Sequence, residues 1–382
     1  MTWLSFLKLG ALVLSAVLGT AACRRAPDRF SPGGNPGETF YFVPARERVA
    51  AMTFDDGPSA PATEQILNSL RRESVMATFF LVGQNAERHP GLVRRIRDEG
   101  HELGAHSYAH LRFDQVPAAE MEADIVKGVR AVEAIAGAEL RWFRPPFGIN
   151  GPGMDEVCRR EGLSIVGWSG DANDWNPHAV DDLVRRVVSQ AVPGMILLLH
   201  DGWETRAEAD RLRTAAAVPL IVRELKARGY RLVGLSELLR LGGPPAAVFA
   251  NGIRLLGVQV PDSEIPPGDA AWARFFWEFP AHWAGPAPIG FAHVIDRAGR
   301  IVTQADHELR LPRDVRDREV RRALTIPPGT RAGRYAMRVG VVDPDRPGVL
   351  SRVRPVRSLF QRKGRAVVIP DAVRVGRNIE PG

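Results

Sequence analysis

Two adjacent carboxylates, Asp55 and Asp56, follow an apolar run at residues 49–54 that has the character of a short buried strand. The Gly57-Pro58 pair after them is typical of a turn. Neighbouring side chains at a strand end point in different directions, so the two acids need not share one role. Two crowded carboxylates repel each other unless a cation or a shared proton relieves the repulsion, which makes this motif a candidate metal site. Taken alone, the pattern also fits an exposed acidic turn.

Two histidines, His106 and His110, are the next candidate ligands along the chain. Their spacing of four places both imidazoles on one face if the segment forms a helical turn. Two histidines and one carboxylate, with positions left for water and substrate, form a catalytic rather than a structural metal set. A histidine pair can have this spacing by coincidence at a surface, but this pair begins where another predicted strand, residues 102–105, ends.

An arginine and a proline pair follow in residues 141–148, which read RWFRPPFG. The Pro145-Pro146 pair fixes an extended loop, and Arg144 just before it can reach a carboxylate with its rigid fork. The backbone N–H of Phe147 is free to serve as a donor to an oxyanion. An ordinary proline-rich exit from a strand is the alternative interpretation of this segment.

Acids, an aromatic side chain and a histidine end two further predicted strands. Asp171, Asp174 and Trp175 follow the fifth strand, and His200 ends a fully apolar strand in the sequence LLHD. A histidine at such a position can act as an acid or base near neutral pH. A buried core histidine with satisfied hydrogen bonds is the alternative for His200.

The elements that position these motifs alternate between strand and helix. Seven strands are predicted at residues 50–54, 77–82, 102–105, 141–144, 164–168, 195–199 and 230–234. Helices are predicted between them at residues 63–72, 90–99, 120–136, 155–161, 180–191 and 211–228. This alternation indicates a parallel sheet, and seven strands suit a closed or nearly closed (β/α) barrel better than a two-layer sheet. Active sites of such barrels lie at the carboxyl ends of the strands, where the polar motifs fall.

The last third of the chain has a different pattern. After a predicted linker at residues 242–252, alternating apolar positions and turn signals predict an antiparallel β-sandwich over residues 253–375. A dense aromatic cluster in this region could form a platform for sugars. However, Phe275, Trp277 and Phe279 fall on one strand face, which a sandwich core explains better.

The N-terminus has the features of a targeting segment. An apolar stretch at residues 9–18 is too short to span a bilayer and is followed by small residues, which predicts a signal peptide over residues 1–22. Cys23 would then be the first mature residue, as in a lipid-anchored bacterial lipoprotein. An ordinary secretory signal or an uncleaved anchor are the alternatives. Residues 23–45 are rich in proline, glycine and charge, and are predicted to be a tether.

The length and composition of the chain set further limits. A chain of 382 residues with 45% hydrophobic and 25% charged residues is typical of a soluble protein of two domains. Its net charge of +7 favours contact with anionic surfaces such as a membrane or a cell-wall polymer. The arginines are scattered, so no nucleic-acid partner is expected. Cys158 is the second of two cysteines, and a lipidated Cys23 could not pair with it, so we expect no disulfide.

Five motifs, TFDDGP, HSYAH, RWFRPPFG, DANDW and LLLHDG, occur in this order between residues 46 and 240. Together they resemble the five motifs of the polysaccharide deacetylase family, carbohydrate esterase family four, which includes the chitooligosaccharide deacetylases. The resemblance implies a distorted (β/α) barrel, here residues 46–241. The region after it loosely resembles immunoglobulin-like accessory domains of bacterial envelope proteins.

The resemblance also implies a cofactor and roles for individual residues. Asp56, His106 and His110 would bind one divalent metal ion, most often Zn²⁺ and sometimes Co²⁺ or Ni²⁺. The metal lowers the pKa of water towards neutrality. The resemblance further implies that Pro145, Trp175 and Leu198 contact the substrate.

The acid–base chemistry follows from the same resemblance. Asp55 would be the general base that deprotonates the attacking water, with Arg144 holding it in place. The backbone N–H of Phe147, where tyrosine is commoner in the family, would stabilise the oxyanion. His200 would donate a proton to the leaving amine, its charged form favoured by Asp174.

These expectations combine into one function. We expect a metal-dependent enzyme that removes acetyl groups from an extracytoplasmic polysaccharide containing N-acetylglucosamine, such as peptidoglycan, a chitin-like polymer or an exported polymer. An O-deacetylase of a polysaccharide such as xylan is one alternative, and a non-catalytic glycan-binding envelope protein is another. The intact pair of Asp55 and His200 argues against the non-catalytic alternative.

Overall fold

The structure, a computed structural model, describes residues 34–176, 178–203, 211–243, 245, 247–249, 251–260, 264–280, 288–309, 319–342, 353–354, 361–363 and 366–375. These residues lie within one compact unit, Ser31–Gly382. The predicted signal peptide, Cys23 and the first part of the predicted tether lie outside the described residues and stay predictions. None of the described helices combines the length and the apolar character that a membrane crossing requires.

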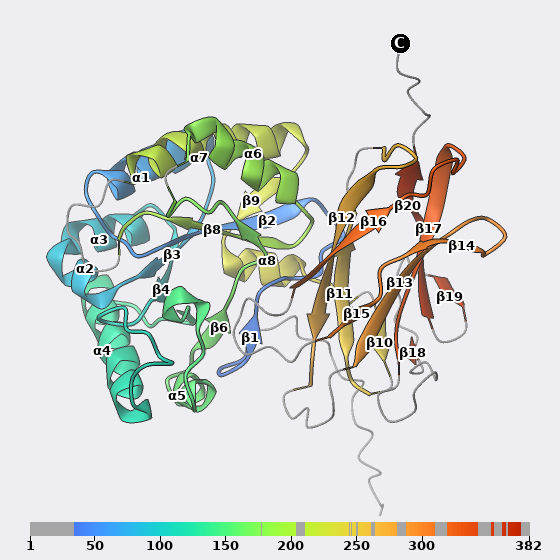
Figure 1. Ribbon diagram of the computed structural model, residues 1–382. Coiled ribbons are helices and arrows are strands. Elements are labelled where there is room, and N and C mark those ends of the chain that lie inside the picture. Colours follow the sequence, from blue (N-terminus) through green and yellow to red (C-terminus); the bar gives the residue numbers. More distant parts are fainter. Residues whose placement is uncertain are drawn as a thin grey trace, which may run out of the picture. The chain divides into compact units, whose positions relative to one another are not determined.

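The first part of the chain forms a nine-stranded sheet in which all neighbouring strands are parallel (Figure 1). The strand order is β1-β6-β5-β4-β3-β2-β8-β7, with β9 also paired to β2. Among the described residues β1 and β7 do not pair with each other, so the sheet is a curled half-barrel rather than a closed barrel. The strands are β1 (Thr39–Phe40), β2 (Val49–Asp55), β3 (Thr78–Leu81), β4 (Glu102–Ala105), β5 (Trp142–Phe143), β6 (Ser164–Val166), β7 (Gly170–Asp171), β8 (Met195–His200) and β9 (Arg231–Val233).

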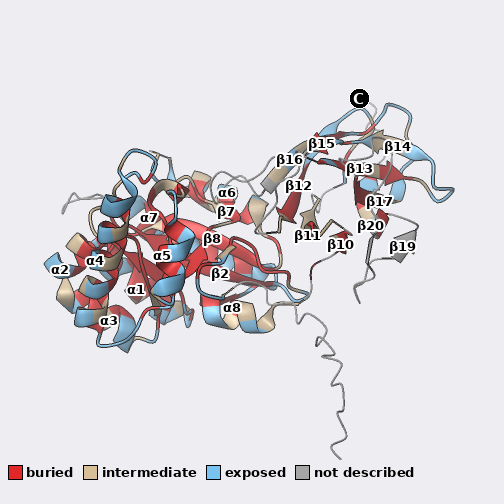
Figure 2. Ribbon diagram, turned by 90° about the horizontal axis from the view of Figure 1, so that it is seen from below, coloured by how far each residue is buried: buried red, intermediate tan, exposed pale blue. Residues whose placement is uncertain are grey.

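The central strands are apolar because both of their faces are covered. Every residue of β2 is buried, as are five of the six residues of β8. Strands of a parallel sheet that is covered on both faces read as continuous apolar runs, which is why the sequence pattern located them. Figure 2 shows these two strands as buried elements at the centre of the domain. All seven predicted strands are confirmed, and β1 and β7 are additional.

Eight helices pack around these strands in the described residues. Each is amphipathic or short, and α1 and α7 pack side by side, as do α2 and α4 (Figure 1). Two of them, α2 with six residues and α8 with seven, were not predicted. The helices are α1 (Ala62–Glu73), α2 (Gly83–Arg88), α3 (Pro90–Asp98), α4 (Ala118–Ala136), α5 (Met154–Arg160), α6 (Val180–Gln190), α7 (Leu212–Ala227) and α8 (Leu235–Leu241).

The end of the predicted tether is part of the folded domain. Residues 39–40 form β1, which pairs with β6, and the side chains of residues 40–43 are buried. These four residues read Phe-Tyr-Phe-Val, and their apolar surface is stabilised by burial. The tether interpretation was therefore wrong for this stretch. It gave weight to the nearby prolines and glycines and overlooked the aromatic residues.

The last part of the chain forms two antiparallel sheets. One has the order β16-β12-β11-β10-β18, and the other has the order β14-β13-β17-β20-β19, with β15 paired to β13. The strands are β10 (Ala247–Phe249), β11 (Arg254–Gln259), β12 (Ala270–Glu278), β13 (Ile289–Ile295), β14 (Ile301–Gln304), β15 (His307–Glu308), β16 (Glu319–Thr325), β17 (Gly333–Val341), β18 (Val353–Arg354), β19 (Gln361–Lys363) and β20 (Ala366–Val375). β10 begins within the predicted linker, residues 242–252, so the sandwich starts earlier than predicted.

One apolar core lies between these two sheets. Phe275 and Trp277 of β12 are buried in it together with Met337 and Val339 of β17, and Phe279 packs against it. This confirms the prediction that the aromatic residues of one strand face form a sandwich core. Trp272, on the same strand, is not buried, and 65% of its surface is exposed.

Candidate active site

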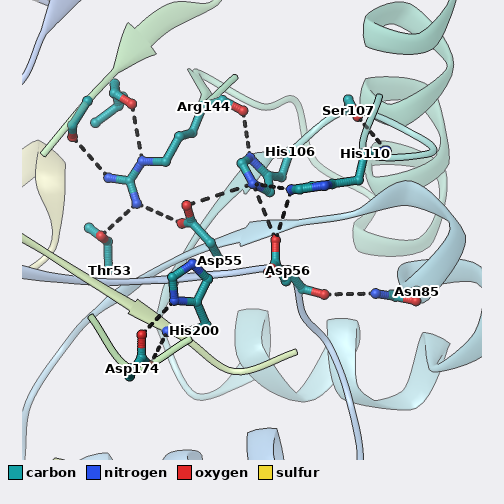
Figure 3. Close-up of polar contacts among 12 residues, drawn as sticks. Thr53, Asp55, Asp56, Asn85, His106, Ser107, His110, Arg144, Asp174 and His200 are labelled. Atoms are coloured by element: carbon teal, nitrogen blue, oxygen red, sulfur yellow. Dashed lines mark hydrogen bonds and ion pairs between the residues drawn. The ribbon is translucent and has the colours of Figure 1, made fainter. Parts of the chain in front are cut away.

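The polar residues that the sequence predicted meet at the carboxyl ends of the parallel strands (Figure 3). Asp55 ends β2, and Asp56 follows it. His106 comes directly after β4, Arg144 directly after β5, and His200 ends β8. Because parallel strands place these ends at one edge of the sheet, residues up to 145 positions apart in sequence become neighbours.

A carboxylate and two imidazoles form the centre of this site. Asp56 Oδ1 lies 3.2 Å from His110 Nε2 and 3.4 Å from His106 Nε2. The two Nε2 atoms are 3.2 Å apart. All three side chains are largely buried, and the three potential ligand atoms lie within 4.8 Å of one another. The structure thus brings together the three residues that the sequence predicted as metal ligands.

A backbone carbonyl sets the tautomer of one histidine. Nδ1 of His106 lies 2.7 Å from the carbonyl oxygen of Arg144, which can only accept a hydrogen bond. Nδ1 therefore carries the proton, and Nε2 keeps the lone pair that a metal ion requires. The carbonyl oxygen of Asp56 accepts a hydrogen bond of 2.8 Å from Asn85 Nδ2, which fixes the backbone of the carboxylate ligand.

The donor set fits a divalent cation. Burial alone would raise the pKa of Asp56, but His106 and His110 hold it well below its ordinary value, so the carboxylate is charged at neutral pH. Asp56 Oδ1 and His110 Nδ1 are buried without a hydrogen-bond partner. A buried anionic oxygen between two imidazole nitrogens is costly unless a cation or a proton is bound there. Two nitrogens and one oxygen are ligands typical of Zn²⁺ and related metals.

The backbone around these ligands is strained. Three site residues have φ in the left-handed region: Asp56 at 70°, His110 at 56° and Phe147 at 58°. Such conformations cost of order 1–3 kcal/mol each for residues other than glycine, and persist where surrounding contacts enforce them. The stretch from His106 to His110 is therefore a loop and not the helical turn that the spacing suggested. The hydroxyl of Ser107 holds this loop by accepting a 3.0 Å hydrogen bond from the His110 N–H.

Arg144 is fully buried and holds Asp55. Its Nη1 donates to Asp55 Oδ1 over 2.6 Å and to the hydroxyl of Thr53 over 2.8 Å. Nε and Nη2 donate to the carbonyl oxygens of Val166 and Gly167, each over 3.1 Å. Burial lowers the pKa of Arg144 and the Asp55 carboxylate opposes that shift. A buried guanidinium with every donor group engaged keeps Asp55 in one orientation.

His200 forms a second acid–base pair with Asp174. Its Nδ1 lies 2.7 Å from Asp174 Oδ1, and its backbone N–H donates to Asp174 Oδ2 over 2.9 Å. Burial disfavours a charge on His200, but Asp174, Asp56 and Asp55 together raise its pKa to about 9. The imidazolium form is therefore present at neutral pH, as a general acid requires.

Two residues that the sequence interpretation missed support Asp174. The hydroxyl of Thr214 donates to Asp174 Oδ2 over 2.8 Å, and Arg211 Nη1 donates to the Asp174 carbonyl oxygen over 3.1 Å. Both lie at the start of α7, outside the five motifs. A polar residue in the first buried turn of a helix was the only signal in the sequence, and many surface helices have the same feature.

The predicted substrate-contacting residues differ in their exposure. Trp175 is 53% exposed beside Asp174, whereas Pro145 and Leu198 are buried. The ring of Phe147 packs on His110, with ring centroids 4.6 Å apart. Its backbone N–H remains a predicted oxyanion donor. Asp171, by contrast, accepts a hydrogen bond from the Asn173 N–H.

The ligand assignment predicts that His106→Ala loses bound metal and activity together. The change removes one of two imidazole ligands and leaves an incomplete set. Metal content measured by atomic emission after gel filtration, together with acetate release, checks this expectation. His178→Ala, which removes a half-buried histidine outside the candidate ligand set, serves as the control and should keep both. Stoichiometric metal in His106→Ala would contradict the assignment.

Support of Asp174 by α7 predicts a smaller effect for Thr214→Val. Valine keeps the shape but cannot donate to Asp174 Oδ2. A lost hydrogen bond of about 1 kcal/mol corresponds to a fall of about fivefold in kcat/KM. Steady-state kinetics check this value, with exposed Thr325→Val as the control. Equal kinetics for Thr214→Val and the original protein would show that the hydroxyl does not support Asp174.

The chain is similar to known deacetylases over this domain. A family model described as polysaccharide deacetylase matches residues 43–166. A peptidoglycan-N-acetylglucosamine deacetylase of Bacillus cereus is 39% identical over 206 residues, which are 53% of this chain and 94% of that protein. A chitooligosaccharide deacetylase of Azorhizobium caulinodans is 34% identical over 190 residues, covering 47% of this chain and 90% of that protein.

A solved structure shares the fold of the same region. The crystal structure of the Bc1960 peptidoglycan N-acetylglucosamine deacetylase, in complex with 4-naphthalen-1-yl-N-oxidanyl-benzamide, matches with a TM-score of 0.50 at 31% identity. The match covers 54% of this chain and 94% of that one. Its extent, about half of the chain, agrees with the length of the parallel half-barrel. With the motifs at the strand ends, these similarities show that the chain belongs to the polysaccharide deacetylase family of enzymes.

Proposed function

We propose that this protein is a metal-dependent hydrolase that removes N-acetyl groups from N-acetylglucosamine in an extracytoplasmic polysaccharide, such as peptidoglycan, and releases acetate. One observation carries the proposal. Asp55 and His200 are paired residues on the neighbouring strands β2 and β8, so a carboxylate and an imidazolium lie beside the Asp56 carboxylate. Hydrolysis of an amide needs both a base and an acid next to the group that activates the carbonyl.

The substrate class rests on the relatives. The Bacillus cereus protein is named for peptidoglycan N-acetylglucosamine, and the Azorhizobium protein for chitooligosaccharides. Both substrates carry the same N-acetylated sugar. The predicted signal peptide (residues 1–22) and a possible lipid anchor at Cys23 would place the enzyme near such a polymer outside the cytoplasm.

The cofactor that we propose is one divalent metal ion, most often Zn²⁺, with Co²⁺ or Ni²⁺ as possible substitutes. Asp56, His106 and His110 would hold it, since they provide the donor set described above. When bound, such a cation polarises a carbonyl and lowers the pKa of water.

The side chains of this protein perform the proton transfers. Asp55, held by Arg144, takes a proton from the attacking water while the oxygen of that water forms a bond to the acetamide carbon. The backbone N–H of Phe147 would stabilise the resulting oxyanion. His200 then gives its proton to the nitrogen as the C–N bond breaks, so the products are acetate and a free amine. Asp174 keeps His200 protonated before this step.

Acetate release by the full chain tests the proposal. Chitooligosaccharides, peptidoglycan and acetylated xylan are each incubated with and without chelator, and with added Zn²⁺ or Co²⁺. We expect acetate with an equal amount of new free amine from the first or second substrate, lost on chelation. Acetate without free amines would instead indicate an O-deacetylase. No acetate from a metal-loaded protein would overturn the enzymatic proposal for these substrates.

A further inference from the structure

A groove lies at the opposite edge of the parallel sheet from the candidate active site. This groove has a volume of about 1110 Å³. Its lining includes Arg48, Pro193 and Tyr230, which come just before β2, β8 and β9. The candidate active site follows the other ends of the same strands, so a ligand in the groove does not compete with substrate. The outer face of β11, β12 and β16 supplies the other wall.

The charge of the groove is one-sided. Among the residues that the structure describes, its lining contains four arginines, Arg48, Arg228, Arg274 and Arg321, and neither aspartate nor glutamate. Arg274 and Arg321 are direct partners across the strands β12 and β16. Like charges directly opposite each other repel, and both guanidinium groups add to the positive charge of this wall. Anionic groups that enter the groove would gain favourable interactions with guanidinium groups.

Two of these arginines also build the groove. Arg274 donates to the backbone carbonyl oxygens of Ser169 and Gln190, which connects β12 to the residue before β7 and to the end of α6. Arg48 donates to the Arg228 carbonyl oxygen over 2.6 Å. These acceptors are backbone carbonyl oxygens, so the contacts fix where the two guanidinium groups lie. The groove is therefore shaped and charged by the same side chains.

An exposed aromatic side chain stands among these charges. Trp272 lines the groove and is 65% exposed. It shares a strand face with Arg274, because side chains two positions apart on β12 point to the same side. The opposite face of β12 supplies Phe275 and Trp277 to the sandwich core. The core thus explains those two residues but not Trp272, which offers an apolar face on which a sugar ring can stack.

We propose that this groove binds an acidic polysaccharide, a strand whose sugars carry carboxylate or phosphate groups. Arginines would bind the anionic groups with their planar forks, and Trp272 would stack on a sugar ring. A polysaccharide chain can enter a concave groove and touch both walls, whereas a flat membrane surface cannot. Such a second contact would keep the enzyme on a polymer between reactions, because it raises the effective concentration of nearby acetylated sugars. The binding itself does not depend on the proposed catalytic function.

Affinity measurements with the full chain test this site. The probes are a polyuronate, a phosphorylated glycan, neutral dextran, a single-stranded oligonucleotide and phosphatidylglycerol vesicles. The double variant Arg228→Gln/Arg321→Gln removes two exposed charges and spares Arg274 and Arg48. We expect its Kd for an acidic glycan to rise at least tenfold. By analogy with other polyanions, the slope of log Kd against log salt should fall by about 1 for each arginine.

A second variant and a control separate stacking from charge. Trp272→Ala should raise Kd severalfold and leave the salt slope unchanged. The control Arg71→Gln/Arg297→Gln removes two exposed arginines that do not belong to the lining and should bind like the original protein. Hydrolysis of a short chitooligosaccharide should be equal in all of them, which keeps this test distinct from the proposed activity.

Three outcomes would overturn the proposal. The first is equal binding of acidic glycans by the double variant and the original protein. The second is an equal loss in the control, which would indicate a general effect of net charge. The third is tighter binding of vesicles or of the oligonucleotide than of either acidic glycan. The polyuronate and phosphorylated glycan arms show which anionic group the groove prefers.

Discussion

Asp55→Asn is expected to lower kcat for deacetylation by about 10³-fold while the protein keeps its metal. General base catalysis contributes about 10²–10⁴-fold, and an amide cannot take the proton from water. Asparagine has the size of aspartate, and its oxygen can still accept the hydrogen bond that Arg144 donates to Asp55 Oδ1. The three candidate ligands are unchanged by the substitution, so KM and metal content should change little. Steady-state kinetics and metal analysis of the same sample measure both effects.

The control for this prediction is Asp181→Asn, the same substitution at an exposed position of α6. It should retain both activity and metal. Asp55 Oδ2 lies 3.8 Å from His106 Nε2. Asp55 is therefore close enough to the candidate metal site to be a metal ligand instead of a general base, and the metal analysis tests this alternative. Loss of metal together with turnover in Asp55→Asn would place this residue among the ligands. Unchanged turnover would remove it from the mechanism.

The sequence predicted much of the site because its residues end strands with strong apolar patterns. Asp55 follows β2 and His200 ends β8, and both strands are almost fully buried. In a parallel sheet such strands read as continuous apolar runs, and their ends are well marked. Once the sheet was predicted to be parallel, the convergence of these residues at one edge followed from topology.

The conformation of the histidine loop could not be predicted in the same way. A spacing of four suggested a helical turn, yet His110 has φ of 56° and the stretch is a loop. His106 is oriented by the Arg144 carbonyl oxygen, 38 residues further along the chain. Such a contact depends on which strands are neighbours, and local sequence does not report it. The residues were predicted correctly although the reason for their proximity was wrong.

The residues that hold Asp174 could not be predicted from local sequence either. Thr214 and Arg211 lie 40 and 37 residues after Asp174, on a helix that looks ordinary in sequence. Nothing in their local pattern marks them as part of a site.

In the sandwich, prediction from sequence was limited in another way. Alternation correctly assigned Phe275 and Trp277 to the core, but the wall that faces Trp272 comes from another domain of the chain.

Asp174→Asn is expected to shift the alkaline limb of the pH–activity profile to lower pH. His200 must be protonated to act as an acid, so activity is present below its pKa and lost as the pH rises through it. Burial lowers this pKa, and Asp174 makes the largest contribution among the groups that raise it to about 9. Asparagine removes that charge, so His200 loses its proton at lower pH. A bound divalent cation would also lower the pKa of His200, but to the same extent in the original protein and in the Asp174→Asn variant.

The size of this shift distinguishes electrostatic support from simple positioning. The asparagine oxygen can still accept hydrogen bonds from the Thr214 hydroxyl and the His200 backbone N–H, which holds the backbone in place, but its NH2 group cannot accept the bond from His200 Nδ1. If Asp174 acted only by holding the ring, kcat/KM would fall at every pH and the limb would stay in place. Asp181→Asn, which neutralises an exposed carboxylate of α6, is the control for a general loss of negative charge. A shift for Asp174→Asn and none for Asp181→Asn would assign the acid role to His200, whose Nδ1 contacts Asp174 Oδ1.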